Sequence, residues 1–380
     1  MKFCTIICEY NPFHNGHRYQ LAEAKARSNT DATLCLMSGN FVQRGEASVC
    51  DKFTRAKHAV LGGADIVLEL PTLFATSNAE LFAKGAISIL SKIPSATTLC
   101  FGAETADKPA FLSAARLLKE EPKEVSQKLK ELISSGVSYA KARAEAWAEF
   151  LPKDLLHSPN NILGLEYTKA IIEQGASLDI LPIQRMGGGY REETLQPCFS
   201  SASAIRKAIS QKEDISAQVP DFVAKDLQND LENHLEILEK YALLIRSKEE
   251  IASVCDCKEG LENAFKKAAE KTTSLVEELT SARYTSSRIR RIALQNLLGI
   301  SEALIRQALQ APLYLRVLAI NKEKTDLLSA LAKSNLPLLI RANDVEQLTG
   351  VAKQVYEIDI FAEKIYNLLY PTEKNNNIFI

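Results

Sequence analysis

The sequence predicts an α/β fold: a doubly wound, Rossmann-like parallel sheet followed by a second, mostly helical C-terminal domain. In the first two hundred residues, short apolar runs alternate with amphipathic stretches, which is typical of parallel strands joined by crossover helices. After about residue 219 the strand pattern fades, and apolar residues recur with helical spacing. The expected strands are residues 1–8, 32–37, 66–70, 97–101 and 178–183.

The chain also divides along its length. Its 380 residues suffice for two domains of about 100–200 residues each, and we place them at residues 1–215 and 216–380. Residues 108–150, rich in Ala, Lys, Glu and Leu, predict a helical insertion that could form a lid or a partner surface. Strand-like runs at 313–320 and 336–340 are expected to form a small α/β tail.

Composition excludes several classes of protein. A hydrophobic fraction of 46%, a charged fraction of 24% and a net charge of -1 exclude a disordered chain and a uniformly basic nucleic-acid coat protein. No apolar run reaches the roughly 20 residues that span a bilayer, and the first residues do not form a signal peptide, so we expect a cytoplasmic protein. The eight cysteines are scattered, and we expect reduced, structural thiols and no metal site.

The most informative segment, CEYNPFHNGH at residues 8–17, follows the first strand directly. His14 and His17 lie where the strand gives way to a helix, whose free amides and positive dipole end attract phosphate. Gly16 lets the backbone approach a triphosphate, and each imidazole can donate a hydrogen bond to a phosphate oxygen. The segment predicts a nucleotide site. The alternative is a chance turn in which one histidine caps the helix and the other is solvated.

A second helix start carries similar chemistry. In FSSASAIR, at residues 199–206, the hydroxyls of Ser200, Ser201 and Ser203 can cap a helix and donate to phosphate. Arg206, on the first turn, is placed to clamp a leaving pyrophosphate. The alternative is an ordinary helix cap followed by a surface arginine.

The carboxyl ends of the expected strands form one mouth, where doubly wound sheets bind ligands, and three further polar segments could contribute to it. In RMGGGY, at 185–190, three glycines permit close approach to adenine or phosphate, unless the segment is simply a flexible loop. SPNN at 158–161 supplies asparagine amides that could cap a helix or bind adenine or ribose. Lys52 and Arg55 could meet phosphate or a substrate carboxylate, or form surface ion pairs.

A basic segment lies in the helical half, where no acidic residue occurs between Glu278 and Glu302. It carries four arginines, Arg283, Arg288, Arg290 and Arg291. Such a surface attracts a phosphate backbone. The alternative is a solvated basic face balanced by nearby acidic helices.

With these motifs in this order, the chain resembles the tRNA(Met) cytidine acetate ligase family of the HIGH-type nucleotidyltransferase superfamily. The likeness rests on HNGH at 14–17, on the series GNFVQRGE, DK..RA, GAD and ELP between residues 39 and 71, and on SPNNILGLEY at 158–167. It covers the first two hundred residues closely, and RYTSSRI at 283–289 extends it into the helical domain.

The resemblance implies that ATP and acetate give acetyl-adenylate and pyrophosphate. The acetyl group then passes to N4 of the wobble cytidine of elongator tRNA(Met), forming N4-acetylcytidine. His14, His17, Arg206 and Lys52 would be the catalytic residues, and any Mg²⁺ would arrive with the nucleotide. Residues 1–215 would then be the ATP-binding catalytic domain and 216–380 the tRNA-binding domain.

The resemblance also implies binding residues. Those for tRNA are Arg283, Arg288, Arg290 and Arg291. Those for ATP are Ile7, Cys8, Glu9, Tyr10, Asn11, Pro12, Phe13, His14, Asn15, Gly16, His17, Arg18, Tyr19, Gln20, Gly102, Asn160, Asn161, Arg185, Met186 and Ser203.

Two other functions stay open. A small-molecule adenylyltransferase would use the same first motif, but it needs neither a large helical domain nor an arginine cluster. A catalytically inactive RNA-binding relative would keep the fold, although the intact histidines, Ser203 and Arg206 argue against it.

Overall fold

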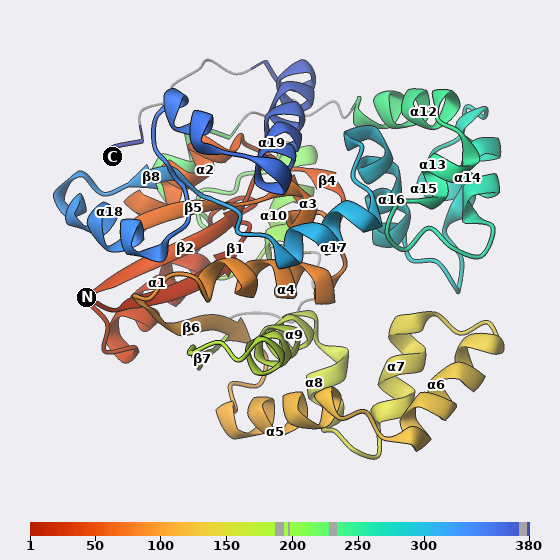
Figure 1. The fold of residues 1–380 in the computed structure, drawn as a ribbon, viewed down its shortest axis with the longest axis horizontal. Coiled ribbons are helices and arrows are strands. Elements are labelled where there is room, and N and C mark those ends of the chain that lie inside the picture. The colour runs from red at the N-terminus through yellow and green to blue at the C-terminus, as the bar shows by residue number, and fades with distance from the viewer. Residues whose placement is uncertain (187–193, 197, 228–233, 372–377) are drawn as a thin grey trace.

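The computed structural model describes residues 1–186, 194–196, 198–227, 234–371 and 378–380 and has a seven-stranded sheet at its centre (Figure 1). The strand order is β7–β6–β1–β2–β5–β8–β9. The strands are β1 (Phe3–Cys8), β2 (Ala32–Ser38), β5 (Ile66–Leu70), β6 (Ala96–Ala103), β7 (Asp179–Gln184), β8 (Leu315–Ile320) and β9 (Leu338–Leu339). Among the strand pairs of the described residues in this sheet, β5–β8 alone is antiparallel, so the predicted doubly wound parallel fold is confirmed.

Helices cover both faces of the sheet because successive side chains of a buried strand point to opposite sides. Cys4 and Ile6 of β1 face one helical layer, whereas Phe3 and Ile7 face the other. The first layer contains α1 (Asn15–Arg27), α2 (Lys52–Leu61), α10 (Ala202–Ser210) and α11 (Asp221–Ala224). The second contains α3 (Thr72–Ala75), α4 (Ala79–Leu90), α9 (Pro159–Gln174), α17 (Glu302–Gln310) and α19 (Gly350–Leu369).

The predicted helical insertion is confirmed and projects from the sheet between β6 and α9 (Figure 1). It consists of α5 (Lys108–Lys119), α6 (Lys123–Ser134), α7 (Tyr139–Trp147) and α8 (Lys153–His157). Phe111 and Trp147 are buried and join the core of the second layer. The insertion is therefore packed onto the sheet domain through its apolar face.

The predicted helical region forms a unit at one end of the molecule (Figure 1). Its helices are α12 (Leu235–Ile245), α13 (Lys248–Ala252), α14 (Leu261–Ala269), α15 (Leu275–Leu279) and α16 (Ser286–Leu298). Leu243, Phe265, Ile289 and Ile292 belong to a core of their own, separate from the two sheet layers. We call residues 235–298 the helical unit.

The last part of the chain differs from the expected two-domain division. Instead of forming a separate tail on a second domain, β8 and β9 extend the main sheet and α19 covers it. Strand β8 pairs with β5, with Ile66 opposite Ile320, and so removes an otherwise open sheet edge. The helical unit is thus inserted between parts of the sheet domain.

The remaining elements are short and lie between the strands and helices described above. They are the hairpin strands β3 (Phe41–Val42) and β4 (Glu46–Ala47), α18 (Asp326–Leu331), and 3₁₀ helices at Lys322–Lys324, Ala332–Ser334 and Ala342–Gln347. Across the described ranges, every helix is too short or too polar to cross a membrane.

Candidate active site

A pocket with an empty volume of about 470 Å³ opens where the carboxyl ends of β6 and β7 meet the start of α1. Eight residues predicted for ATP line it: His14, Gly16, His17, Tyr19, Gln20, Gly102, Arg185 and Met186. Ser200 and Ser201, from the second predicted phosphate segment, line it as well. Two motifs far apart in the chain therefore meet at one pocket.

Sequence reasoning missed three lining residues, Ile183, Gln184 and Phe199. Ile183 and Gln184 end β7, which pairs with β6 so that Ile183 lies opposite Gly102. The predicted strand at 178–183 was the available signal, because its carboxyl end had to reach the same edge as Gly102. The 187–190 part of the glycine segment lies outside the described residues.

The two histidines form a stacked pair at the start of α1. Their ring centroids are 3.6 Å apart, with an angle of 25° between the planes. His14 is the helix cap, and its Nδ1 accepts a hydrogen bond from Gly16 N at 3.0 Å. His17 Nδ1 accepts from His14 N at 3.3 Å. Because both Nδ1 atoms accept, the proton of each neutral ring is on Nε2, and both rings can donate there.

Gly16 makes this arrangement possible. A Cβ at residue 16 would lie 2.9 Å from His14 Cε1 and 3.0 Å from its Nδ1. The glycine therefore leaves room for the cap imidazole to fold over the helix start, a steric role different from the phosphate approach that the sequence suggested.

Both imidazoles are held in the neutral state. Burial, and then the positive charges of Arg185 and Arg206, lower the pKa of His14 to about 3. Burial and the neighbouring His14 lower the pKa of His17 well below its ordinary value. At neutral pH the pair is thus a set of uncharged N–H donors, suited to stabilising negative charge without transferring a proton.

Aromatic packing fixes the rings. The His17 ring lies 4.7 Å from that of Tyr10 and 5.8 Å from that of Phe13, centroid to centroid. Tyr10 and Phe13 are buried in the first helical layer together with Ile6. Several residues of the predicted ATP segment are therefore core residues that pack against the histidines. Ile7 and Cys8 are buried in the core as well.

Arg206 lies beside the histidine segment. Its Nη1 donates to the carbonyl oxygen of Asn11 at 2.8 Å, and its Nη2 donates to Ser203 Oγ at 3.4 Å. Ser201 caps α10 by accepting from Ala204 N at 3.1 Å. The starts of α1 and α10 thus both contribute to the pocket, and each adds the positive end of a helix dipole.

Glu104 organises the loop that follows β6, next to the pocket residue Arg185. Its carboxylate accepts from Asn160 Nδ2 at 2.6 Å and from Asn161 N at 3.1 Å, and lies 3.8 Å from Arg185 Nε. The Asn161 amide oxygen accepts from the backbone N–H of both Glu104 and Thr105. Asn161 is fully buried, so its visible role is to hold the loop after β6 next to Gly102.

Other predicted ATP residues lie around the segment without lining the pocket. Asn15 donates to the carbonyl oxygen of Ala217 at 2.9 Å, and Asn11 Oδ1 accepts from Val49 N at 2.8 Å. Arg18 is exposed on α1, and Pro12 is buried.

Lys52 and Arg55 lie outside the pocket lining. Lys52 Nζ is 2.7 Å from Glu69 Oε1 and 3.0 Å from Glu363 Oε2, and its side chain is 1% exposed. Arg55 donates to main-chain carbonyl oxygens, including that of Glu9, at the ends of β1 and β2. The structure brings neither side chain together with the histidine pair, and both hold the sheet edge in place.

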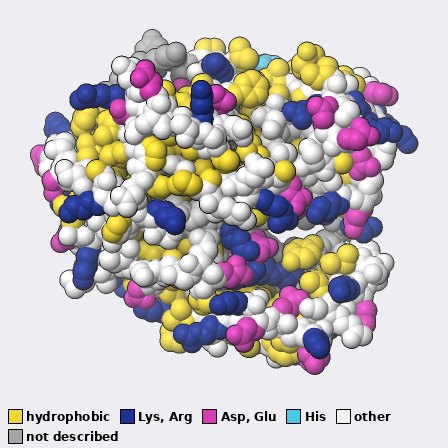
Figure 2. Space-filling view, viewed as in Figure 1, with side chains coloured by type: hydrophobic (Ala, Val, Ile, Leu, Met, Phe, Trp, Pro, Cys, Tyr) yellow, Lys and Arg dark blue, Asp and Glu magenta, His cyan; other side chains and the backbone are white. Residues whose placement is uncertain are grey.

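The predicted tRNA arginines are largely paired. Arg288 donates twice to the Asp256 carbonyl oxygen, and Arg291 lies 3.7 Å from the Asp256 carboxylate. Arg283 pairs with Glu259 at 2.8 Å. Figure 2 shows Lys and Arg mixed with Asp and Glu over the helical unit and around the hollow between it and the insertion.

Arg290 connects the helical unit to the pocket side. Its Nη1 lies 3.1 Å from Glu46, and the same carboxylate lies 3.9 Å from Arg206. At Gly45 the hairpin meets α16 so closely that a Cβ would lie 2.6 Å from the Arg290 backbone. The β3–β4 hairpin thus lies between Arg290 of the helical unit and Arg206 beside the pocket.

Comparisons with known proteins agree with this arrangement. A family profile described as HIGH Nucleotidyl Transferase matches residues 1–378. Curated proteins named tRNA(Met) cytidine acetate ligase are similar along the whole length. The one from Thermoanaerobacter sp. (strain X514) is 38% identical and covers 100% of this chain and 97% of its own. The one from Acetivibrio thermocellus is 36% identical and covers 97% of this chain and 95% of its own.

Solved structures agree as well. The crystal structure of apo Thermotoga maritima TmcAL superposes with a TM-score of 0.88 at 30% identity, covering 98% of this chain and 96% of the other. The same protein bound with alpha-thio ATP gives a TM-score of 0.86 at 30% identity, covering 99% and 96%.

Proposed function

The chain belongs to the tRNA(Met) cytidine acetate ligase family, and we propose that it activates acetate with ATP and acetylates the wobble cytidine of elongator tRNA(Met). The product would be N4-acetylcytidine. The observation that carries this proposal is the pair of neutral Nε2–H donors, His14 and His17, beside two helix starts and Arg206. This arrangement favours chemistry at a phosphorus atom, where negative charge must be stabilised.

In the first step an acetate oxygen attacks the α-phosphorus of ATP. The bond from that phosphorus to the oxygen bridging to the β-phosphate breaks, and pyrophosphate leaves with the electron pair. His14 and His17 donate to the oxygens of the α-phosphoryl group, and Arg206 neutralises the leaving pyrophosphate. The product is acetyl-adenylate, and no side chain forms a covalent intermediate.

ATP would occupy the pocket between α1 and the carboxyl ends of β6 and β7. Gly102, with no side chain, leaves space for the ribose, and Arg185 supplies a cation near Glu104. The catalytic groups proposed here are imidazoles and a guanidinium, so Mg²⁺ accompanying ATP would be coordinated by phosphate oxygens and water. The alpha-thio ATP complex of the Thermotoga maritima protein supports a nucleotide in this fold.

In the second step N4 of the cytidine attacks the acetyl carbonyl carbon, and AMP leaves. The tRNA would approach from the helical unit, where Arg283 and Arg290 are partly exposed. We propose that this unit is the tRNA-binding part of the chain. We also propose that the protein works in the cytoplasm, where tRNA and ATP occur and where free thiols such as its eight cysteines stay reduced.

Pyrophosphate release tests the proposal. The ligase releases pyrophosphate from ATP only when acetate is present, and adding elongator tRNA(Met) gives acetylated tRNA. A small-molecule adenylyltransferase would be indifferent to acetate, and an inactive RNA-binding relative would release none. Acetate-independent release, or no release, would therefore overturn the assignment.

A further inference from the structure

Acetylation of cytidine needs a group that removes a proton from N4, and the two histidines are poorly suited to this. Each Nδ1 already accepts a backbone N–H, so each Nε2 carries the proton that it would donate to phosphate. Low pKa values also make both rings weak bases. The proton acceptor must therefore lie elsewhere around the reacting atoms.

Glu9 directly follows the carboxyl end of β1 and lies on the opposite face of the sheet from Tyr10 and Phe13. Phe3 and Ile7 point into the second helical layer, and strand alternation places Glu9 on that same side, opposite the layer that holds Tyr10 and Phe13. The carboxylate is fixed because its Oε1 accepts from Gln43 N at 2.8 Å, and the residue is partly accessible to solvent.

Arg206 connects Glu9 with the histidine pair. Its Nη1 donates to the carbonyl oxygen of Asn11, two residues after Glu9, and its Nη2 lies 3.9 Å from Glu46 of the hairpin whose Gln43 N–H holds the Glu9 carboxylate. A phosphorus atom held by the histidines and Arg206 would therefore lie close to the segment from Glu9 to Asn11 that follows β1.

Among the described residues, Glu46 and Glu104 are the other carboxylates tied to this centre, and both are engaged. Glu46 is shared between Arg206 and Arg290. Glu104 accepts from Asn160 and from the Asn161 backbone and lies beside Arg185. Glu9 accepts a hydrogen bond from one backbone N–H, which orients the carboxylate and still leaves it able to accept a proton.

We propose that Glu9 is the general base of the acetyl-transfer step, an inference that rests on the proposed function. The N4 lone pair forms the new C–N bond to the acetyl carbon, and the C–O bond to the adenylate breaks with its electron pair going to AMP. The proton lost by N4 passes to the Glu9 carboxylate, which becomes a neutral acid and later releases it to water.

The electrostatics of the site agree with this role. Burial raises the pKa of the Glu9 carboxyl above its ordinary value, whereas the Gln43 N–H and the cations Arg206, Arg44 and Arg55 act in the opposite direction. Within the described ranges, the charged and titratable groups that interact electrostatically with Glu9 include these three arginines and Tyr167 of α9. A carboxylate with a raised pKa is a better base than an ordinary one.

The test separates the two half-reactions in the full-length protein. Glu9→Gln keeps an oxygen that can accept from Gln43 N but removes the base. Acetyl transfer to tRNA, measured in a single turnover from preformed acetyl-adenylate, is expected to fall by roughly 100- to 10,000-fold. Acetate-dependent ATP–pyrophosphate exchange is expected to fall far less, by under about tenfold. Glu23→Gln, a change of a partly exposed carboxylate on α1 that pairs with Arg27, is the matched control and leaves both steps at the wild-type rate.

A second variant and a pH profile distinguish a base from a structural residue. Glu9→Asp keeps a carboxylate, so it should retain part of the transfer rate that Glu9→Gln loses. Its transfer rate should also fall at acidic pH, where the carboxylate is protonated. Glu9→Gln should lose that acidic limb. Transfer at the wild-type rate in Glu9→Gln, or equal loss of both half-reactions, overturns the inference. Absence of acetate-dependent exchange in the wild-type protein would instead overturn the proposed function.

Discussion

The Arg290 guanidinium of α16 lies 3.1 Å from the Glu46 carboxylate of the β3–β4 hairpin. Glu46 also lies 3.9 Å from Arg206, so one carboxylate is shared by the helical unit and the nucleotide pocket. A phosphate bound by Arg290 and a pyrophosphate bound by Arg206 would both change the pairing of Glu46. The structure therefore links the proposed RNA side and the proposed ATP side through a single acidic group.

This link predicts that Glu46 and Arg290 act together. We expect Glu46→Gln and Arg290→Gln to change acetyl transfer non-additively, with a coupling of about 0.5–3 kcal/mol in a double-mutant cycle. Arg283→Gln is the matched control, because Arg283 pairs with Glu259 instead and should combine additively with Glu46→Gln. Additive effects for Glu46 and Arg290 would show that their contact carries no coupling.

The histidine pair predicts a selective loss of adenylation. His14→Asn keeps a side-chain helix cap but lacks the Nε2–H donor, and His17→Ala removes the second donor. Each should lower acetate-dependent pyrophosphate release by roughly 100- to 1000-fold while tRNA affinity changes little. Thermal melting checks that the fold survives. Wild-type release rates in both variants would contradict the role assigned to the pair.

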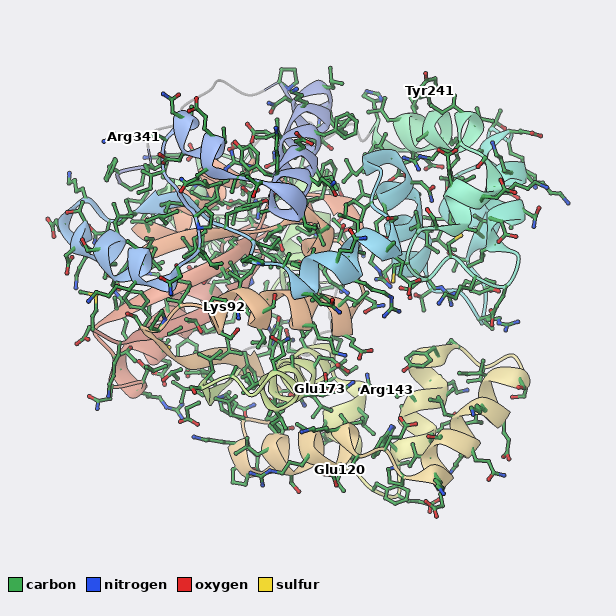
Figure 3. All side chains as sticks on the ribbon, in the orientation of Figure 1. Lys92, Glu120, Arg143, Glu173, Tyr241 and Arg341 are labelled. Carbon is green, nitrogen blue, oxygen red and sulfur yellow. The ribbon has the colours of Figure 1, made fainter. Side chains whose placement is uncertain are left out.

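The helical unit predicts a salt-dependent contribution of Arg283 to tRNA binding. Arg283→Glu should weaken tRNA affinity and reduce the slope of log affinity against log salt by about one, while adenylation persists. Lys92→Glu, which makes the same charge change far from the helical unit, is the control (Figure 3). Equal tRNA affinity for the two variants at several salt concentrations would count against this surface.

Lys52 offers a test of whether its role is structural. Its Nζ is buried between Glu69 and Glu363, and Arg316 Nη1 lies 3.0 Å from Glu69. Lys52→Met leaves these acids without one partner, and we expect unfolding free energy to fall by about 3–5 kcal/mol. Denaturant unfolding measures this change. Unchanged stability with lost adenylation would instead support the catalytic role that the sequence suggested.

Glu239 predicts a pH-dependent stability of the helical unit. Burial, and then the neighbouring Glu236, raise its pKa to about 8 from an ordinary value of 4.5. Below pH 4.5 the carboxyl is protonated in both the folded and unfolded states. As pH rises toward 8, the unfolded chain ionises first, so this group increasingly favours unfolding.

Glu239→Gln should remove that trend. The variant is expected to match the wild type near pH 4.5 and to melt at a higher temperature near pH 8. Glu249→Gln, at an exposed position on α13, is the control and should leave the pH profile unchanged. Parallel melting profiles for Glu239→Gln and the wild type would refute this assignment of the pH dependence.

Local patterns were enough to predict much of the fold. The runs that became β1, β2, β5, β6 and β7 are short and apolar, and the helices of the helical unit follow 3.6-residue spacing. The neighbours of β8 were not predictable in this way. Its pattern identifies a strand, but its pairing of Ile320 with Ile66 depends on residues far apart in the sequence.

In the candidate site, too, contacts between residues close in sequence could be predicted, whereas contacts between distant residues could not. His14, Gly16 and His17 lie within one turn of helix, so their proximity was visible in the sequence. The buried partners of Lys52 were not, because Glu69 and Glu363 come from distant elements, and a phosphate-binding lysine has the same local pattern. The approach of Glu46 to Arg290 likewise depends on how the hairpin meets α16.

The central claim is that acetate attacks the α-phosphorus of ATP at the histidine pair, and isotope transfer tests it most directly. Acetate labelled with ¹⁸O in its carboxylate is incubated with the protein, ATP and elongator tRNA(Met), and the AMP is analysed by mass spectrometry. One labelled oxygen should appear in the AMP phosphate, and His14→Asn should abolish its appearance. Unlabelled AMP alongside acetylated tRNA, or the formation of ADP in place of AMP, would contradict the account.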